Sequence, residues 1–132
     1  MLAIAYRNGK PIGQIKLISV AGKLVEEKAA QAFLAMREAA KANGITLKLS
    51  SGFRTMEEQE QLYEAYQNGT GNYAARPGYS NHQNGTALDI SVRSSFESPE
   101  YLWLAENAAD FGFENTGRYF KQPEPWHWEL IA

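Results

Sequence analysis

Hydrophobic and polar residues alternate in four short segments of the chain, and this pattern is typical of strands. The first segment covers residues 12–20, and the second, with the sequence ITLKL, covers residues 45–49. Residues 87–92 and the aromatic-rich tail at 125–131 give the other two. Together they predict the strands of one small sheet.

Three further segments have the spacing of helices, at residues 25–42, 55–68 and 98–111. Each is followed by a glycine, which is a common residue after a helix. The apolar face of the first is formed by Val25, Ala29, Ala32, Met36 and Ala40, with Phe33 at its edge. Residues 68–79 are polar and rich in glycine, and we expect a long loop there. Because strands and helices mix without regular β-α-β spacing, we predict an α+β fold, a small antiparallel sheet with flanking helices.

Composition narrows the range of partners. The length of 132 residues suits one domain. The net charge of −2 argues against a nucleic-acid partner, since proteins that bind nucleic acids usually have a basic face. The chain has no cysteine, which excludes disulfides and thiolate metal sites. The sequence shows neither a recognisable secretory signal nor an apolar run of about 20 residues, so we expect no membrane span. We also expect a monomer.

Two histidines and an aspartate suggest a metal site. His82 and Asp89 are separated by Asn84 and Gly85, which form a strong turn signal. A two-residue turn there would place His82 opposite Ala87, with Asp89 diagonally across. Diagonal partners in a hairpin are about 7–8 Å apart, so both side chains could reach one ion.

The second histidine, His127, completes a possible set of ligands. Together with His82 and Asp89 it supplies two nitrogens and one oxygen. Three protein ligands with one open position are the pattern of catalytic rather than structural zinc. Each of these residues taken alone would more often be an ordinary surface, core or capping residue, so the hypothesis depends on their joint pattern.

Two glutamates and an arginine are candidates for a general base and for a carboxylate-binding group. Glu124 has the opposite strand parity from His127 and is poorly placed as a ligand, but it could act as a general base on a water at the metal. Glu129 shares the face of His127 and is the rival candidate. Either could instead be a solvated charge at a strand end. Arg54, between a predicted strand and helix, could bind a carboxylate or could pair with a surface glutamate.

Three motifs in order resemble those of the VanY-type D-alanyl-D-alanine carboxypeptidases. This zinc metallopeptidase group also includes L-alanyl-D-glutamate endopeptidases and the hedgehog fold. The family pattern is a Ser-Gly-Tyr-Arg-like segment, then S-x-H-x-x-G-x-A-x-D, then E-x-W-H. The chain reads SGFR at 51–54, SNHQNGTALD at 80–89 and EPWH at 124–127. Phe53 replaces the commoner tyrosine. The segment ARPGYS at 75–80 also looks like the carboxypeptidase branch.

The resemblance implies one metallopeptidase domain over residues 1–132. It implies a Zn²⁺ ion bound by His82, Asp89 and His127. It also implies that Glu124 is the catalytic base and that Arg54 anchors a substrate carboxylate, with Ser80 and Gln59 lining the pocket.

The activity implied is removal of terminal D-alanine from peptidoglycan stem peptides, at the bacterial cell wall in the periplasm or outside the cell. Two alternatives remain open. One is an endopeptidase that cuts within the stem or cross-bridge on the same zinc site. The other is a non-catalytic binding module of the same fold. Zinc-dependent turnover separates the second alternative from both enzymes.

Overall fold

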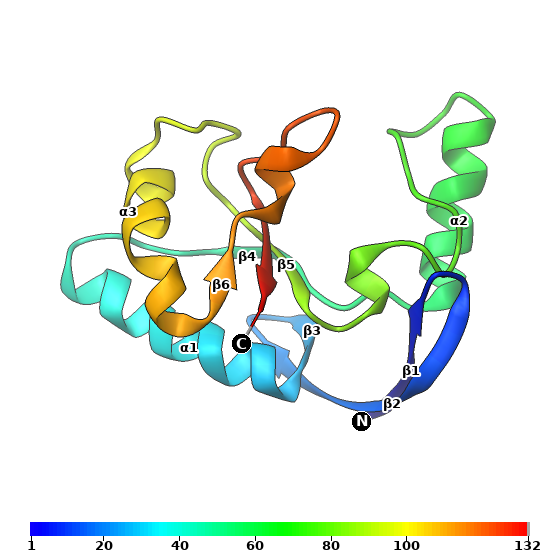
Figure 1. Ribbon diagram of the computed structural model, residues 1–132, viewed down its shortest axis with the longest axis horizontal. Coiled ribbons are helices and arrows are strands. Elements are labelled where there is room, and N and C mark those ends of the chain that lie inside the picture. Colours follow the sequence, from blue (N-terminus) through cyan, green and yellow to red (C-terminus); the bar gives the residue numbers. More distant parts are fainter. Residues whose placement is uncertain (132) are drawn as a thin grey trace.

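A computed structural model describes residues 1–131, and their strands form two antiparallel sheets (Figure 1). The first sheet has the order β1-β2-β3, with β1 (Leu2–Arg7), β2 (Lys10–Val20) and β3 (Lys23–Glu26). The second has the order β4-β5-β7-β6, with β4 (Leu49–Ser51), β5 (Ala87–Ile90), β6 (Phe113–Glu114) and β7 (His127–Leu130). The α+β prediction is confirmed. The strand predicted at residues 12–20, however, lies in the first sheet as part of β2, so the four predicted strands do not form one sheet.

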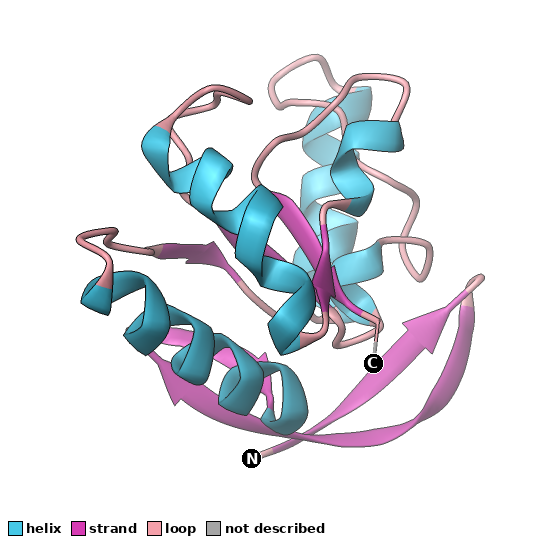
Figure 2. Ribbon diagram, turned by 60° about the vertical axis from the view of Figure 1, so that its left-hand side comes forward, coloured by secondary structure: helices cyan, strands magenta, loops and turns pink. Residues whose placement is uncertain are grey.

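The chain has three α-helices, of which α1 and α3 lie on one side of the molecule and α2 on the other (Figure 1 and Figure 2). They are α1 (Glu27–Ala42), α2 (Met56–Gln67) and α3 (Pro99–Asn107), with shorter 3-10 helices η1 (Asn81–Gln83), η2 (Ala108–Phe111) and η3 (Thr116–Tyr119). α2 begins where the sequence predicts, because Thr55 and Glu58 form a capping box. The predicted third helix is α3 continued by η2, and it ends at Gly112, whose φ is 86°. Within residues 1–131, no helix combines the length and apolar character needed to cross a membrane.

The N-terminal region differs from the prediction in two ways. β1 was not expected, although Asn8 and Gly9 have φ values of 53° and 79° and form the turn of a β1–β2 hairpin. β3 occupies the start of the predicted first helix, because Val25 pairs with β2 and is buried there. The side chain of Glu26 then accepts hydrogen bonds from two backbone N–H groups, so α1 begins at Glu27.

The predicted strand at 45–49 is displaced toward the C-terminus. Its alternation of burial is real, since Leu47 and Leu49 are buried. Pairing with β5 begins only at Leu49, however, and continues through Ser51, which lies opposite Asp89. The strand therefore extends into polar residues near the candidate site. Its position is set by hydrogen bonding to β5, which the apolar pattern does not specify.

The hydrophobic core fixes the central strands of the second sheet. Phe33 and Met36 of α1, Leu88 of β5, Leu104 of α3 and Trp128 of β7 belong to one buried cluster. Ala32, expected on the buried face of α1, is only partly buried. The Trp128 indole N–H donates to the Pro125 carbonyl over 2.9 Å. With these alternate residues held inside, the other faces of β5 and β7 present Asp89 and His127 together.

Candidate metal centre

The structure brings His82, Asp89 and His127 into one cluster. β5 and β7 are antiparallel neighbours, and Asp89 lies directly opposite His127. His82 Nε2 is 3.2 Å from Asp89 Oδ1, and His127 Nδ1 is 3.4 Å from the same oxygen. Two ligand atoms about 2.1 Å from a tetrahedral ion lie about 3.4 Å apart, so these separations suit zinc. The three ligand atoms all fall within 4.8 Å of one another.

The route by which His82 reaches the cluster corrects the hairpin prediction. His82 lies in η1 and not on a strand opposite Ala87, and the neighbours of β5 are β4 and β7. Asn84 has a right-handed helical φ of −75°, and only Gly85 has a positive φ, of 91°. The Asn-Gly signal therefore ends a 3-10 turn. The chain does bend as the spacing requires, but by a different local structure.

Each histidine is held in the tautomer that leaves a lone pair facing Asp89. His82 Nδ1 is 2.9 Å from the Gly52 carbonyl oxygen, and a carbonyl can only accept, so Nδ1 carries the hydrogen. His127 Nε2 is 3.3 Å from Glu129 Oε2, which assigns the hydrogen of His127 to Nε2 by the same reasoning. The remaining nitrogens, His82 Nε2 and His127 Nδ1, are free to act as metal ligands.

With both histidines in these tautomers, the buried Asp89 Oδ1 accepts no hydrogen bond within residues 1–131. Three lone pairs therefore converge on one point, an arrangement that a cation stabilises. Without a cation, a proton serves instead. Burial lowers the pKa of His127, but hydrogen bonds to Asp89 and Glu129 outweigh burial and raise that pKa to about 9. Burial raises the pKa of Asp89, but hydrogen bonds from His127 and His82 outweigh it and hold the pKa well below its ordinary value. The residues fit a divalent metal.

Glu129 supports His127 from the side away from Asp89. Its Oε2 accepts hydrogen bonds from Thr116 Oγ1 at 2.5 Å and from Asn81 Nδ2 at 3.2 Å. Burial raises the pKa of Glu129, but the hydrogen bonds from His127 and Thr116 outweigh burial and lower it. A carboxylate that orients a ligating histidine in this way also raises the basicity of the ligand nitrogen.

Replacing Glu129 by Gln is expected to weaken zinc binding by about 10- to 100-fold, the usual cost of losing a partner behind a ligand. The amide keeps the shape of the side chain but loses the charge that His127 Nε2 contacts. A competition titration with a chromophoric chelator measures the change. Glu106→Gln, at an exposed position of α3, is the matched control and should leave zinc affinity unchanged. Equal affinities in the two variants would contradict the supporting role.

Glu124 lies on the ligand side of His127. Its Oε1 is 3.9 Å from His127 Nδ1, and its side chain is 32% exposed. Burial raises the pKa of the Glu124 carboxyl, and although His127 lowers it, the negative charge of Asp89 adds to the rise. Glu124 and Glu129 thus flank opposite nitrogens of one imidazole ring, and only Glu124 shares the side on which a metal would lie.

Asn115 fixes the turn that joins Glu124 to His127. Its Nδ2 donates to the carbonyls of Glu124 and His127 over 3.1 and 2.8 Å, and its Oδ1 accepts from Tyr101 Oη over 2.8 Å. Gly117 packs against the same turn, where a Cβ would stand 2.4 Å from the Glu124 carbonyl oxygen and 2.7 Å from His127 Cβ. The spacing of Glu124 and His127 therefore depends on residues of the 115–117 segment.

Arg54, Gln59 and Ser80 also come together. Arg54 Nη1 donates to Gln59 Oε1 at 3.0 Å and lies 3.5 Å from Ser80 Oγ, while the Arg54 backbone N–H donates to the His82 carbonyl at 3.0 Å. Burial lowers the pKa of Arg54, against the raising effect of Asp89. Gln59 is completely buried, so it holds Arg54 instead of lining an open pocket as expected. The ion pair of Arg54 with a surface glutamate is not formed among the described residues.

Four residues of the site were not predicted from the sequence, namely Asn115, Thr116, Gly117 and Asn81. The first three form a short polar segment with a glycine, which was a usable signal for a tight turn but carried no indication of its partner. Asn81 and Thr116 act only through Glu129, and their contacts span 48 and 13 residues of sequence.

Comparison with known proteins places the chain in a family. The family model described as VanY, D-alanyl-D-alanine carboxypeptidase, matches residues 22–132. The chain is 34% identical to the D-alanyl-D-alanine carboxypeptidase of Enterococcus faecium, over 82% of this chain and 38% of that protein. It is 32% identical to the D-alanyl-D-alanine carboxypeptidase of Enterococcus faecalis, over 72% of this chain and 44% of that protein. The chain thus spans less than half the length of these relatives.

Solved structures show the same fold. VanYB in complex with D-alanine-D-alanine has a TM-score of 0.75 and 26% identity, covering 98% of this chain and 86% of that one. A vancomycin resistance D,D-pentapeptidase VanY in complex with Zn(II) has a TM-score of 0.74 and 25% identity, with coverages of 98% and 87%. The L,D-carboxypeptidase DacB of Streptococcus pneumoniae has a TM-score of 0.65 and 32% identity, with coverages of 82% and 67%. The resemblance of the three motifs is confirmed, and the chain belongs to the VanY family of D-alanyl-D-alanine carboxypeptidases.

Proposed function

We propose that the chain is a zinc-dependent D,D-carboxypeptidase that removes terminal D-alanine from peptidoglycan stem peptides. One observation carries the proposal: a carboxylate and a guanidinium flank the same three ligands. Glu124 lies beside the ligand nitrogen of His127, and Arg54 is tied through its backbone to His82. A general base and an anchor for a terminal carboxylate are the two groups that hydrolysis of a C-terminal peptide bond requires in addition to a metal.

The metal ligands and Glu124 have different roles in the proposed reaction. A zinc ion held by His82, Asp89 and His127 would lower the pKa of a bound water and would polarise the scissile carbonyl. Glu124 Oε1 accepts the proton of the attacking water and returns it to the leaving amine. The amide C–N bond breaks, and the products are a peptide shortened by one residue and free D-alanine.

We also propose where the protein acts and in which oligomeric state. The protein would act as a monomeric domain over residues 1–132 on stem peptides of the bacterial cell wall. The family and the named activities of its relatives support this choice of substrate. An endopeptidase or an L,D-carboxypeptidase would use the same metal centre on a different bond, so the products of digestion decide between them.

The decisive test is digestion of defined stem peptides followed by mass spectrometry. A pentapeptide ending in D-Ala-D-Ala should lose one alanine, and the chelated enzyme should leave it intact. Cleavage of a tetrapeptide between its third and fourth residues would indicate an L,D-carboxypeptidase. Two larger fragments would indicate an endopeptidase. Activity that survives complete removal of metal would overturn the zinc mechanism.

Arg54→Ala is expected to lower kcat/KM about 10- to 150-fold, because a charge-assisted bidentate contact contributes roughly 1.5–3 kcal/mol. Arg54→Lys should recover only part of this, since an ammonium cannot reproduce the planar fork. The measurement is kcat/KM on matched peptides with a free or an amidated C-terminus. Amidation should impair the wild-type enzyme about as much as the Arg54→Ala substitution does.

Two controls separate carboxylate binding from a structural effect. In Arg54→Ala, amidation should add little further loss, because its partner is already removed. Arg37→Gln, on α1, removes a guanidinium of the same kind away from the site and should behave like wild type. Equal cleavage of the free and amidated peptides by wild type would exclude Arg54 as the anchor.

A further inference from the structure

Gln83 is a completely buried polar residue to which the proposed reaction gives no role. It follows the metal ligand His82 in η1. Its Oε1 accepts a hydrogen bond from the Gly78 N–H over 2.7 Å, and its backbone N–H donates to the Ser80 carbonyl over 3.0 Å. Because Gln83 is shielded from solvent, it cannot touch a substrate. Any effect of its side chain on the reaction must act through the residues that it holds.

The residues that Gln83 holds belong to the loop of residues 75–80, which is fixed at two points. Gln59 Nε2 donates to the Ala75 carbonyl over 2.7 Å, at the start of the loop. The contact between Gln83 and Gly78 fixes the loop nearer its end. Gln59, like Gln83, is completely buried. Two buried glutamines therefore hold this loop from the interior of the protein.

The β1–β2 hairpin supports the same loop from its other side. The Gly9 N–H, at the tip of the hairpin, donates to the Gly78 carbonyl over 3.0 Å. The two backbones are so close that a Cβ on Gly78 would stand 2.7 Å from Gly9 Cα. The Tyr79 ring also packs on this tip, since a Cβ on Gly9 would stand 2.9 Å from Tyr79 Oη. Gly78 thus uses both of its backbone hydrogen-bonding groups, the N–H for Gln83 and the carbonyl for the hairpin.

The loop in turn orients Arg54. Arg54 Nη1 donates to Gln59 Oε1 over 3.0 Å and lies 3.5 Å from Ser80 Oγ. Gln59 is hydrogen-bonded to the first residue of the loop, and Ser80 is its last residue. The two partners of the guanidinium are therefore kept at a fixed separation by the loop between them. A displaced loop would move these partners apart and would direct Arg54 less well at a carboxylate.

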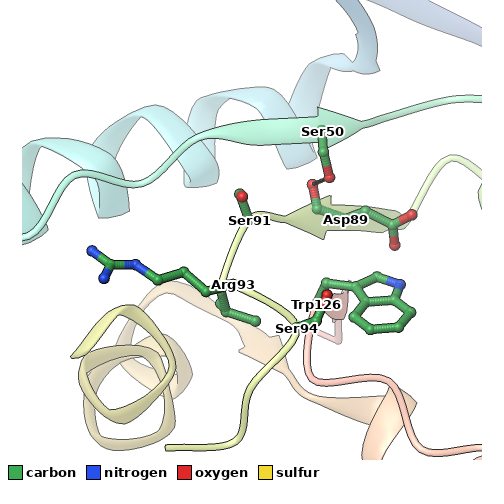
Figure 3. A pocket seen from close by; sticks show the side chains of 7 residues that line it. Ser50, Asp89, Ser91, Arg93, Ser94 and Trp126 are labelled. Atoms are coloured by element: carbon green, nitrogen blue, oxygen red, sulfur yellow. Dashed lines mark hydrogen bonds between the residues drawn. The ribbon is translucent and has the colours of Figure 1, made fainter. Parts of the chain in front are cut away.

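The metal ligands are held by other segments. The His82 ring is fixed by the Gly52 carbonyl, at 2.9 Å from Nδ1. Asp89 is paired with β4 and β7, and the walls of the cavity beside it come from β4, from the segment after β5 and from Trp126 (Figure 3). Loss of the contact between Gln83 and Gly78 should thus affect substrate binding and leave the zinc site intact.

We infer that Gln83 is a positioning residue, which together with the tip of the β1–β2 hairpin fixes residues 75–80 and so holds the Arg54 guanidinium where a terminal carboxylate binds. The inference rests on the proposed function, in which Arg54 is the anchor of that carboxylate. It assigns a part in substrate binding to the N-terminal hairpin, which lies outside residues 22–132 that match the family model.

The test is Gln83→Met, which keeps the approximate size of the side chain but leaves the Gly78 N–H without its acceptor. The readout is the ratio of kcat/KM for a D-Ala-D-Ala pentapeptide with a free C-terminus to kcat/KM for its amide. This ratio should fall about 3- to 10-fold, the range for loss of one hydrogen bond. KM for the free peptide should rise, whereas kcat and zinc content should stay at the wild-type values.

Gly78→Asn tests the contact with the hairpin independently. Asparagine tolerates the φ of 89° at this position, but its Cβ would clash with the Gly9 backbone, so the loop must shift. The ratio should fall as it does in Gln83→Met. Gly69→Asn is the matched control, because Gly69 has a φ of 76° and an added Cβ would meet no atom of the described residues within 4 Å. It should keep the wild-type ratio.

The outcomes separate this inference from the function on which it rests. If wild type prefers the free peptide and Gln83→Met and Gly78→Asn keep that preference, the positioning role is wrong and the carboxypeptidase proposal stands. If Gln83→Met does not fold, Gly78→Asn alone decides. A fall of the ratio in Gly69→Asn as well would overturn the assignment to these contacts. If zinc-loaded wild type cleaves neither peptide, or cleaves both equally, the anchor role of Arg54 and the role of Gln83 fail together.

Discussion

Glu124→Gln is expected to lower kcat by about 10²- to 10⁴-fold, the usual contribution of a positioned general base. The amide cannot accept a proton from water, but it keeps the size of the side chain and the backbone contact of Glu124 with Asn115. The fold and the bound zinc should therefore remain. Steady-state kinetics on a D-Ala-D-Ala peptide, combined with metal analysis of the same sample, measure both quantities.

Glu129→Gln is the matched control, because both glutamates contact His127 but at different ring nitrogens. At saturating zinc, Glu129→Gln should retain most of the activity, because losing the Glu129 carboxylate weakens zinc binding and leaves the general base in place. The reverse result, a nearly active Glu124→Gln and an inactive Glu129→Gln, would assign the base to Glu129. The family correspondence at Glu124 would then be wrong.

Local patterns predicted the parts of the fold that local interactions determine. The start of α2 depends on a capping box between Thr55 and Glu58, three residues apart, and it was predicted correctly. Strand parity in the tail was equally informative. It placed His127 and Glu129 on one face, where their side chains are in contact, and Trp128 on the other, where it fills the core.

The path of His82 into the site depended on contacts that no local pattern specifies. A turn signal at Asn84 and Gly85 shows that the chain bends, but it does not identify which strand pairs with β5. The neighbours of β5 are β4 and β7, from distant parts of the sequence, and the position of η1 is set by the hydrogen bonds to Gly52 and Arg54. The ligand set could be predicted even though its geometry could not.

The residues that hold the metal ligands in position were the hardest part of the site to predict from the sequence. Thr116 and Asn115 have no periodic pattern around them, and their significance appears only when β7 lies beside them. Arg93 and Ser94 are a similar case, because both have left-handed backbone although neither is glycine or asparagine. Positions of this kind become visible only once the backbone is known.

Removing the metal is expected to abolish activity and leave the chain folded. The core residues of α1, α3, β5 and β7 pack without the metal ligands, so folding should survive chelation. Zinc at about 100 times its dissociation constant should still stabilise the fold by about 2.7 kcal/mol, seen as a rise in Tm. Activity, metal content and Tm should all recover when zinc is returned.

Asp89→Ala should have the same effect as chelation and should not be rescued by zinc. It removes the oxygen that lies 3.2 and 3.4 Å from the two ligand nitrogens, so a metal would keep two of its three protein ligands. We expect purified wild type to hold one zinc ion per chain by elemental analysis, and Asp89→Ala to hold almost none. Ser50→Ala is the control, because the Ser50 hydroxyl donates to the backbone carbonyl of Asp89 and not to its carboxylate, so the zinc content should be unchanged. Full activity in metal-free protein, or one zinc ion in Asp89→Ala, would show that these residues do not form the catalytic metal site.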